Sequence, residues 1–274
     1  MKLPVGLQLY SLRDEACKDL DGTLRSVREM GYTGIEFAGL YGHAPEEVRE
    51  LLVKHDLIPV SAHVPLPELL ADIPGTVRAY KIIGCPYIAI PWLEESRRPG
   101  HEQYDQTLKD IEKIAQECQK QGLHLLYHNH DFEFVKVDGQ YALDRMYASI
   151  SPELLQTELD TCWVNVGGED PVEYLHKYAG RAPVVHLKDF YMDQPDDGPK
   201  YELIGVRPDT EEGARTSFEF RAVGFGLQDM PAILKASEAA GAQWLIVELD
   251  RPPAGQTAQE AVRASRQYLT SQGY

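Results

Sequence analysis

The chain has 274 residues, of which 27 are basic and 43 acidic, and its formal net charge is −16 at pH 7. This acidity argues against nucleic acids and anionic membranes as partners, because both bind to positively charged protein surfaces. The apolar runs also fall well short of the roughly 20 residues that a membrane-spanning helix needs. The length suits one large domain, since a closed α/β barrel takes about 250 residues.

The cysteines and the first residues predict a reduced, cytoplasmic protein. The cysteines are far apart and form no CxxC pair: Cys17, Cys85, Cys118 and Cys162. Such spacing is typical of proteins that keep their thiols reduced. The first residues lead directly into a strand-like segment, without the basic and apolar regions of a signal peptide.

Eight short apolar segments are predicted to form strands. They are Val5–Leu9, Gly34–Phe37, Ile58–His63, Tyr87–Pro91, His124–His128, Leu155–Asp160, Pro183–Leu187 and Trp244–Glu248. Several are continuously apolar and rich in β-branched residues, which is typical of strands buried on both faces of a parallel sheet.

Amphipathic segments between these strands predict helices. They are Asp19–Met30, Pro45–His55, Gln103–Gln121, Pro171–Tyr178, Met230–Ala240 and Ala258–Ser271. Gly31, Gly122 and Gly241 each follow a predicted helix, as expected of a left-handed terminal residue. The alternation predicts a single-domain (β/α)₈ TIM barrel over residues 1–274. No GxGxxG follows the first strand, which weakens a nucleotide-binding alternative.

One segment, at about residues 190–228, breaks this alternation. It is polar, contains Asp-Gln-Pro-Asp-Asp-Gly-Pro at 193–199, and follows the seventh predicted strand. Long loops in compact domains usually carry a function or are disordered. We interpret it as a βα loop over the active site, acting as a lid or an oligomer contact, with a solvated surface excursion as the alternative.

Polar side chains gather where the predicted strands end, and a (β/α)₈ barrel carries its active site there. His128 and His130 are two residues apart, so on a strand they lie on the same face. The other candidates are Gln8, Tyr10, Glu36, His63, Asn129, Glu133, Glu158, Asp160, His186, Lys188, Asp189, Glu248 and Asp250. Buried carboxylates need a compensating cation. This mixture of carboxylates and imidazoles therefore predicts one divalent metal ion, with Mn²⁺ favoured and Mg²⁺, Co²⁺ or Zn²⁺ as alternatives.

Short motifs at these strand ends resemble those of the xylose isomerase-like TIM barrels. That superfamily contains sugar phosphate isomerases/epimerases, ketose 3-epimerases, inosose dehydratases and endonuclease IV. The motifs are Gln8-Leu9-Tyr10-Ser11, Gly34-Ile35-Glu36, Ser61-Ala62-His63, Tyr127-His128-Asn129-His130, Leu159-Asp160-Thr161, His186-Leu187-Lys188-Asp189, Val223-Gly224-Phe225-Gly226 with Asp229, and Glu248. The resemblance implies a carbohydrate substrate and one metal ion. Similar barrels are commonly dimers or tetramers, which leaves a homo-oligomer open.

The resemblance also implies a set of metal ligands. The family site usually takes Glu, Asp, His and Glu from the last four strands, and Asp160, His186 and Glu248 match three of these. His128 stands where many relatives have the first glutamate. We therefore expect Glu133 to be the fourth ligand, since Mn²⁺ prefers oxygen, with His128 or His130 as the alternative.

The remaining strand-end residues are expected to move protons or bind the substrate. The predicted catalytic residues are Glu248, His128, His130, His63 and Lys188. The predicted substrate-binding residues are Gln8, Glu36, Trp92 and Trp163. For the two tryptophans, packing in the core is an equal alternative to an apolar wall against a sugar ring.

These residues predict an enzyme that acts on a carbohydrate. A metal-polarised carbonyl and a nearby base give an enediolate, which can isomerise, epimerise or lose water. We expect an isomerase/epimerase of a sugar, sugar phosphate or keto-sugar. A dehydratase of a keto-sugar or inosose is the first alternative and a non-catalytic sugar-binding barrel the distant one. Trp163 stands where endonuclease IV has a histidine after Asp-Thr-Cys, which together with the charge disfavours DNA cleavage.

Overall fold

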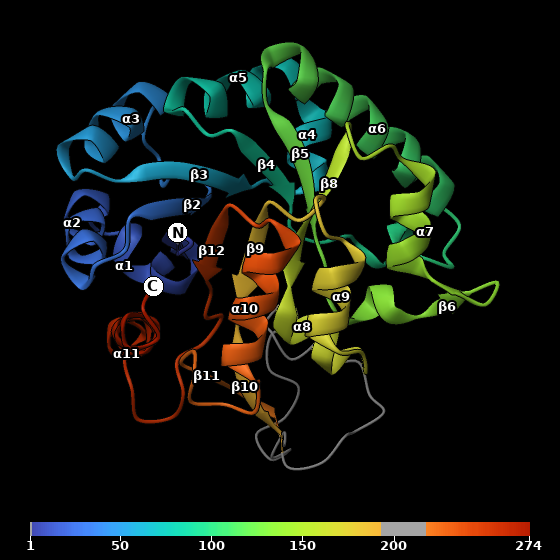
Figure 1. Ribbon diagram of the computed structural model, residues 1–274. Coiled ribbons are helices and arrows are strands. Elements are labelled where there is room, and N and C mark those ends of the chain that lie inside the picture. Colours follow the sequence, from blue (N-terminus) through green and yellow to red (C-terminus); the bar gives the residue numbers. More distant parts are fainter. Residues whose placement is uncertain (1, 193–217) are drawn as a thin grey trace, which may run out of the picture.

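The computed structural model describes residues 2–192 and 218–274, and in these ranges it forms a closed barrel of parallel strands (Figure 1). The strands are β1 (Val5–Gln8), β2 (Gly34–Ala38), β3 (Ile58–His63), β4 (Tyr87–Ile90), β5 (His124–His128), β8 (Leu155–Asp160), β9 (Val184–Leu187) and β12 (Trp244–Val247). Around the barrel they follow the order of the chain, and β1 pairs with both β2 and β12 to close it. The expected (β/α)₈ fold is confirmed.

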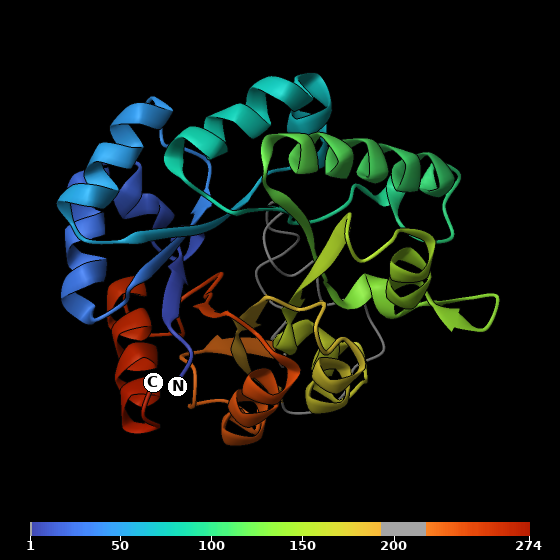
Figure 2. The ribbon, with the colours of Figure 1, turned by 45° about the horizontal axis from the view of Figure 1, so that its top comes forward.

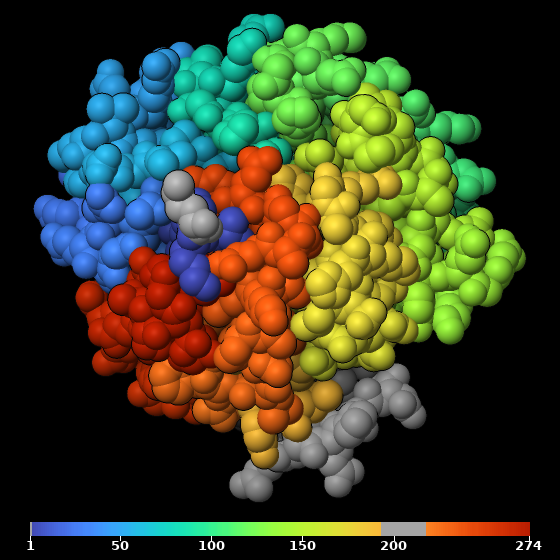
Figure 3. Space-filling model, in the orientation of Figure 1, coloured from blue at the N-terminus to red at the C-terminus, as the bar shows by residue number. Residues whose placement is uncertain are grey.

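Helices surround the barrel and cover the strands (Figure 2). The expected ones are α2 (Leu20–Met30), α3 (Pro45–Lys54), α6 (Tyr104–Gln121), α9 (Pro171–Lys177), α10 (Met230–Ala240) and α11 (Ala258–Ser271). Figure 3 shows α9, α10 and α11 side by side on one face of the molecule. Gly31 ends α2 with a φ of 98°, in the left-handed conformation that its position predicted.

The structure also contains short elements that the sequence patterns did not predict. They are α1 (Arg13–Ala16), α4 (Leu66–Ala71), α5 (Ile73–Ile83), α7 (Ala142–Ser149), α8 (Thr161–Val166), the 3₁₀ turns η1 (Leu9–Leu12), η2 (Glu95–Arg97) and η3 (Asp131–Phe134), and the hairpin β6 (Lys136–Val137) with β7 (Gln140–Tyr141). Pro74 and Gly75 lie in the first turn of α5, where they resemble a loop in the sequence. The Asp72 side chain accepts a hydrogen bond from the Gly75 N–H and so stabilises this helix start.

Apolar side chains fill the interior of the barrel and leave only its carboxyl end polar. An inner cluster contains Val60, Tyr87, Ala89, Leu126, Val184 and Ile246, with Trp244 packed against it. Gly34 makes room for this indole, because a Cβ at Gly34 would lie 2.5 Å from Trp244 and 2.6 Å from Val60. A larger apolar cluster packs the helices onto the outside of the strands. The amino-terminal end of the barrel is thus plugged.

The segment expected to be one long loop contains two strands. Asp189–Met192 (β10) and Phe218–Arg221 (β11) pair antiparallel, and the middle of the expected loop, 193–217, lies outside the described residues. The Asp189 carboxylate anchors the chain after β11 by accepting hydrogen bonds from the N–H groups of Gly224, Gly226 and Gln228 at 2.9–3.2 Å. A role as a lid or an oligomer contact stays a prediction.

The two ends of the described chain lie next to each other, where Lys2 Nζ donates to Tyr274 Oη at 3.1 Å (Figure 2). Among the described residues, we find no helix with the length and apolar character needed to cross a membrane.

Candidate metal centre and pocket

The carboxyl ends of the strands bring most of the predicted site residues into one buried cluster. Gln8, Glu36, His63, His128, Asp160, His186, Lys188 and Glu248 are all buried. Parallel strands that close into a barrel point these ends at one another, so side chains far apart in the sequence converge. Burying so many ionisable groups is costly unless opposite charges lie among them.

Four of these side chains form a compact group of metal-ligand atoms. His128, Asp160, His186 and Glu248 each offer one such atom, all within 4.8 Å of one another. His128 Nε2 lies 3.7 Å from Asp160 Oδ2 and 4.0 Å from Glu248 Oε2, and His186 Nδ1 lies 3.1 Å from the same Glu248 oxygen. The consecutive barrel strands β5, β8, β9 and β12 thus supply imidazole and carboxylate donors that suit a divalent ion such as Mn²⁺ or Zn²⁺.

The buried Asp160 Oδ2 supports this fit. Among the described residues it has no hydrogen-bond partner, and the nearest cation is Lys188 Nζ at 3.4 Å. The other carboxylate oxygen accepts the Trp163 N–H at 3.0 Å. The Asn129 side chain fixes the backbone of Asp160, accepting its N–H at 3.0 Å and donating to its carbonyl oxygen at 3.2 Å. A carboxylate oxygen that is held in place and directed into a group of donors fits a cation there.

Glu133, the expected fourth ligand, lies outside this group of ligand atoms. Tyr127 Oη donates to one oxygen of the Glu133 carboxylate, and the His130 N–H donates to the other at 2.7 Å. These bonds hold Glu133 in the η3 turn, and it does not belong to the group of ligand atoms. Burial raises the pKa of this carboxyl to about 8, so that it is mostly neutral at pH 7. His128 lies where the fourth ligand was expected.

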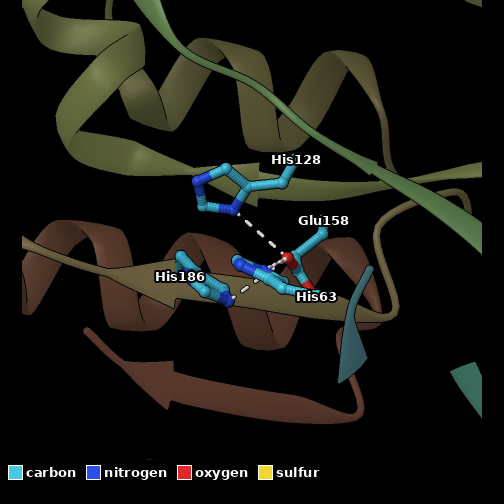
Figure 4. A group of neighbouring side chains, drawn as sticks. All are labelled: His63, His128, Glu158 and His186. Atoms are coloured by element: carbon cyan, nitrogen blue, oxygen red, sulfur yellow. Dashed lines mark hydrogen bonds and ion pairs between the residues drawn. The ribbon is translucent and has the colours of Figure 1, made fainter. Parts of the chain in front are cut away.

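Two further buried carboxylates, Glu36 and Glu158, lie next to the histidines of the ligand group. Glu158 Oε2 is 2.5 Å from His63 Nε2 and 3.1 Å from His128 Nδ1 (Figure 4). Glu36 Oε1 is 2.7 Å from His186 Nε2 and accepts from Gln8 Nε2 at 2.7 Å. Burial and then the charge of Glu36 raise the pKa of Glu158 to about 8. Burial opposes the charge of Glu36, but His63 and His186 lower the pKa of its carboxyl below the usual range.

Lys188 supplies a buried positive charge beside the ligand group. Its Nζ lies 2.8 Å from Glu248 Oε2 and 2.9 Å from Asp250 Oδ2, and 5.4 Å from the centre of the Trp163 ring. Burial works against this charge, but Asp250 and Glu248 outweigh it and raise the pKa of the ammonium group well above its usual value. Burial likewise opposes the charge of Glu248, and Lys188 holds the pKa of that carboxyl well below its usual range.

The ligand group opens into a cavity of about 370 Å³. Its lining is mixed, and consists of Tyr10, Ala38, Gly39, His63, Pro65, Glu68, Pro91, Trp92, His128, His130, Lys188, Glu248 and Asp250. Trp92 lines this cavity, and its role as a substrate contact stays a prediction. The structure places the other predicted substrate contacts behind the lining: Gln8 and Glu36 bond to each other, and Trp163 is fully buried.

Two carboxylates at the site had no assigned role in the sequence analysis, although they were among the strand-end candidates. Glu158 lies two residues before Asp160, and Asp250 lies two residues after Glu248. Residues two apart on an extended strand share a face, so this spacing was the signal that could have found them.

A closed barrel with a pocket at the carboxyl ends of its strands is the arrangement typical of (β/α)₈ enzymes. The family model of the xylose isomerase-like TIM barrel matches residues 24–271, and the chain belongs to that family. The resemblance expected from the sequence is confirmed.

The individual proteins to which the chain is similar share less than 30% of its residues. The chain is 28% identical over 272 residues to an inosose dehydratase of Geobacillus kaustophilus (strain HTA426), covering 91% of this chain and 86% of that protein. The match to the inosose dehydratase of Lacticaseibacillus casei is 24% identical and covers 61% of this chain but only 54% of that protein. A solved sugar phosphate isomerase/epimerase from Parabacteroides distasonis ATCC 8503 is similar with a TM-score of 0.79 at 22% identity, covering 99% of this chain and 94% of that one. These relatives are carbohydrate-processing enzymes, and the structural likeness shows the fold alone.

The raised pKa of Glu133 predicts a pH-dependent stability. Its pKa is about 8 in the folded protein, against an ordinary value of 4.5, so between these values the folded state holds a proton that the unfolded state releases. The contribution of Glu133 to stability therefore falls as the pH rises through this window and is constant above it. We expect the stability of the natural chain relative to Glu133→Gln to fall by roughly 2–4 kcal/mol between pH 5 and pH 8. Urea unfolding of the metal-free proteins measures this, and a difference independent of pH would contradict it.

Proposed function

We propose that this chain is a divalent-metal-dependent lyase that removes water from a keto-sugar or keto-cyclitol. The buried group of His128, Asp160, His186 and Glu248, of which His128 and Glu248 line the pocket, is the observation that carries the proposal. A divalent ion bound there polarises the carbonyl group of a substrate and makes the neighbouring C–H bond more acidic. The long alignment with an inosose dehydratase supports water loss as the outcome.

Two histidines of the pocket are suited to opposite proton transfers. Burial, followed by the charge of Lys188, lowers the pKa of His130, which favours a neutral imidazole. Burial opposes the charge on His63, but the carboxylates of Glu36 and Glu158 raise the pKa of that imidazole above its usual value. A neutral base beside a charged acid is the pairing that an elimination needs.

The two histidines flank one of the proposed ligands. The centre of the His128 ring lies 4.8 Å from that of His63 and 5.1 Å from that of His130. We infer that His130 accepts the proton from the carbon beside the carbonyl and His63 gives a proton to the leaving hydroxyl. One C–H and one C–O bond break, a C=C bond forms, and water leaves. The charged Lys188 orients an oxygen of the substrate.

An isomerase or epimerase is the second candidate, and one observation favours it. Glu158 and Glu248 both approach His186, with Oε2 atoms 3.4 Å from its Nε2 and 3.1 Å from its Nδ1. Two carboxylates on opposite sides of a substrate can remove a proton from one face and return it to the other. Of the two, Glu248 lines the cavity whereas Glu158 lies behind it, and this arrangement favours the lyase.

Metal titration tests the ligand set. We expect one Mn²⁺ per chain, and an affinity at least roughly 100-fold lower in Glu248→Gln and Asp160→Asn, because each substitution removes a charged donor from the ligand group. Glu133→Gln is the matched control, since it changes a buried carboxylate outside that group and keeps the affinity within about threefold. Calorimetry or the electron paramagnetic resonance of free Mn²⁺ gives these values. The opposite ranking, with Glu133→Gln losing the metal, would contradict the assignment.

The reaction itself is tested in D₂O with panels of inososes and keto-hexoses. We expect the Mn²⁺-loaded enzyme to convert a substrate into an ultraviolet-absorbing enone with loss of one water. His63→Gln should lower kcat by about 10²–10⁴, since it removes the acid that protonates the leaving group. Glu112→Gln, on the exposed face of α6, serves as the unaffected control. If solvent deuterium enters a recovered sugar and no enone forms, the result contradicts the proposed lyase and supports an isomerase.

A further inference from the structure

We propose that Glu158 is a positioning residue that fixes His128 in the one tautomer able to bind the metal. The inference rests on the proposed metal site and extends it to a residue outside the ligand set. It concerns His128, the histidine that ends β5 and belongs to the proposed ligand group. A carboxylate ligand has no tautomers, whereas an imidazole must present the correct nitrogen.

The two nitrogens of His128 face different partners. Nδ1 lies 3.1 Å from Glu158 Oε2 (Figure 4). Nε2 lies 3.7 Å from Asp160 Oδ2 and 4.0 Å from Glu248 Oε2, inside that group. A neutral imidazole carries its proton on one nitrogen and its lone pair on the other. A hydrogen bond from Nδ1–H to Glu158 therefore directs the lone pair of Nε2 at the metal site.

The barrel puts Glu158 in the correct place by strand pairing. His128 on β5 and Glu158 on β8 are partners in the parallel register, so they lie side by side at the ends of neighbouring strands. Glu158 and Asp160 share the inward face of β8, because they are two residues apart. Strand β8 therefore supplies Asp160 to the ligand group and places Glu158 beside His128 of the neighbouring strand β5.

His186 also lies between two carboxylates, but among the described residues its Nε2 has no hydrogen-bond partner. Its Nδ1 lies 3.1 Å from Glu248 Oε2, and its Nε2 lies 2.7 Å from Glu36 Oε1. His63 Nε2 joins the two supporting carboxylates, at 3.2 Å from Glu36 Oε1 and 2.5 Å from Glu158 Oε2. Metal-binding histidines in proteins usually donate their second N–H to a carboxylate, as we infer for His128 and Glu158, and this bond fixes the ring and strengthens it as a ligand.

The same side chains have a competing interpretation as a second metal site. His63, His128, Glu158 and His186 also bring ligand atoms within 4.8 Å of one another. Two ions would then need both nitrogens of His128 and both of His186, so each ring would have to lose its last N–H proton. A neutral imidazole has only one lone pair for a metal. The geometry therefore assigns to Glu158 the role of orienting the His128 imidazole, and not that of binding a second metal ion.

Histidine tautomers in the metal-free protein test the proposal directly. Nitrogen-15 labelled histidine distinguishes protonated from bare ring nitrogens, and His128→Gln identifies the His128 signal. We expect Nδ1–H and a bare Nε2 in the natural chain at pH 8. Glu158→Gln keeps an oxygen that accepts this bond and should keep the tautomer, whereas Glu158→Leu should give a mixture of both.

Mn²⁺ affinity gives the second measurement. We expect about a 10-fold loss in Glu158→Gln and about a 100-fold loss in Glu158→Leu, the range found for such supporting groups. Glu133→Gln, also a buried carboxylate, is the matched control and should change neither the affinity nor the His128 tautomer. Circular dichroism checks that each variant is folded. If Glu158→Leu does not fold, the Mn²⁺ affinity of Glu158→Gln relative to that of Glu133→Gln tests the positioning role.

The outcomes separate this inference from the metal proposal. A natural chain that binds no Mn²⁺ contradicts the proposed function, while the tautomer in the metal-free protein still reports on Glu158. Unchanged affinity and tautomer in both Glu158 variants would overturn the positioning role. Two Mn²⁺ per chain, with one lost in Glu158→Gln, would overturn it in favour of a second metal site.

Discussion

The site depends on one constraint: ionised side chains that are buried away from water must be compensated by opposite charges. The carboxyl ends of the strands bury the carboxylates Glu36, Glu158, Asp160, Glu248 and Asp250 within a few ångströms of one another. Lys188 contributes one positive charge against these carboxylates, and its Nζ lies within 3.4 Å of Asp160, Glu248 and Asp250. Such a group is stable only when further cations or bound protons offset the repulsion. The raised pKa of Glu158 and the charge on His63 follow from this repulsion, and a divalent metal ion would offset more of it.

The barrel makes this concentration of charge tolerable by separating it from the rest of the core. Apolar side chains and the Trp244 indole close the amino-terminal end, and the polar groups lie at the other end. Within the polar end the carboxylates divide into two levels. Asp160 and Glu248 belong to the ligand group, and Glu248 lines the pocket, whereas Glu36 and Glu158 lie behind the lining and approach His186 and His128. The layering explains how one site can contain ligands, a neutral histidine and a charged histidine at once.

The fold was predictable from the sequence because its signals are local and repeated. Every barrel strand begins and ends within about one residue of its apolar segment, since a strand buried on both faces needs a continuous apolar run. Helix α5 was not predicted, because Pro74 and Gly75 resemble a turn although the Asp72 cap makes them a helix start. The hairpin of β10 and β11 could not be predicted either, since its partners are separated by a long polar segment.

The sequence indicated which strand-end residues gather at the site, but not which of them contact one another. Asp160, His186 and Glu248 follow from the positions where strands end. The place of Glu133 depends on the η3 turn, which directs its carboxylate to Tyr127 and to the backbone of His130 instead of the ligand group. Glu158 carries the spacing of a strand-face neighbour, but its contact with His128 depends on the register between β5 and β8. Local patterns do not contain that register.

The central claim is that His128 Nε2, Asp160, His186 Nδ1 and Glu248 bind one metal ion. A crystal structure of the Mn²⁺-loaded protein, with anomalous diffraction to locate manganese, tests it most directly. We expect one anomalous peak per chain, in bonding contact with these four side chains and with Glu133 still bonded to Tyr127. A peak bound to Glu133, or one centred between His63 and Glu158, would contradict the account.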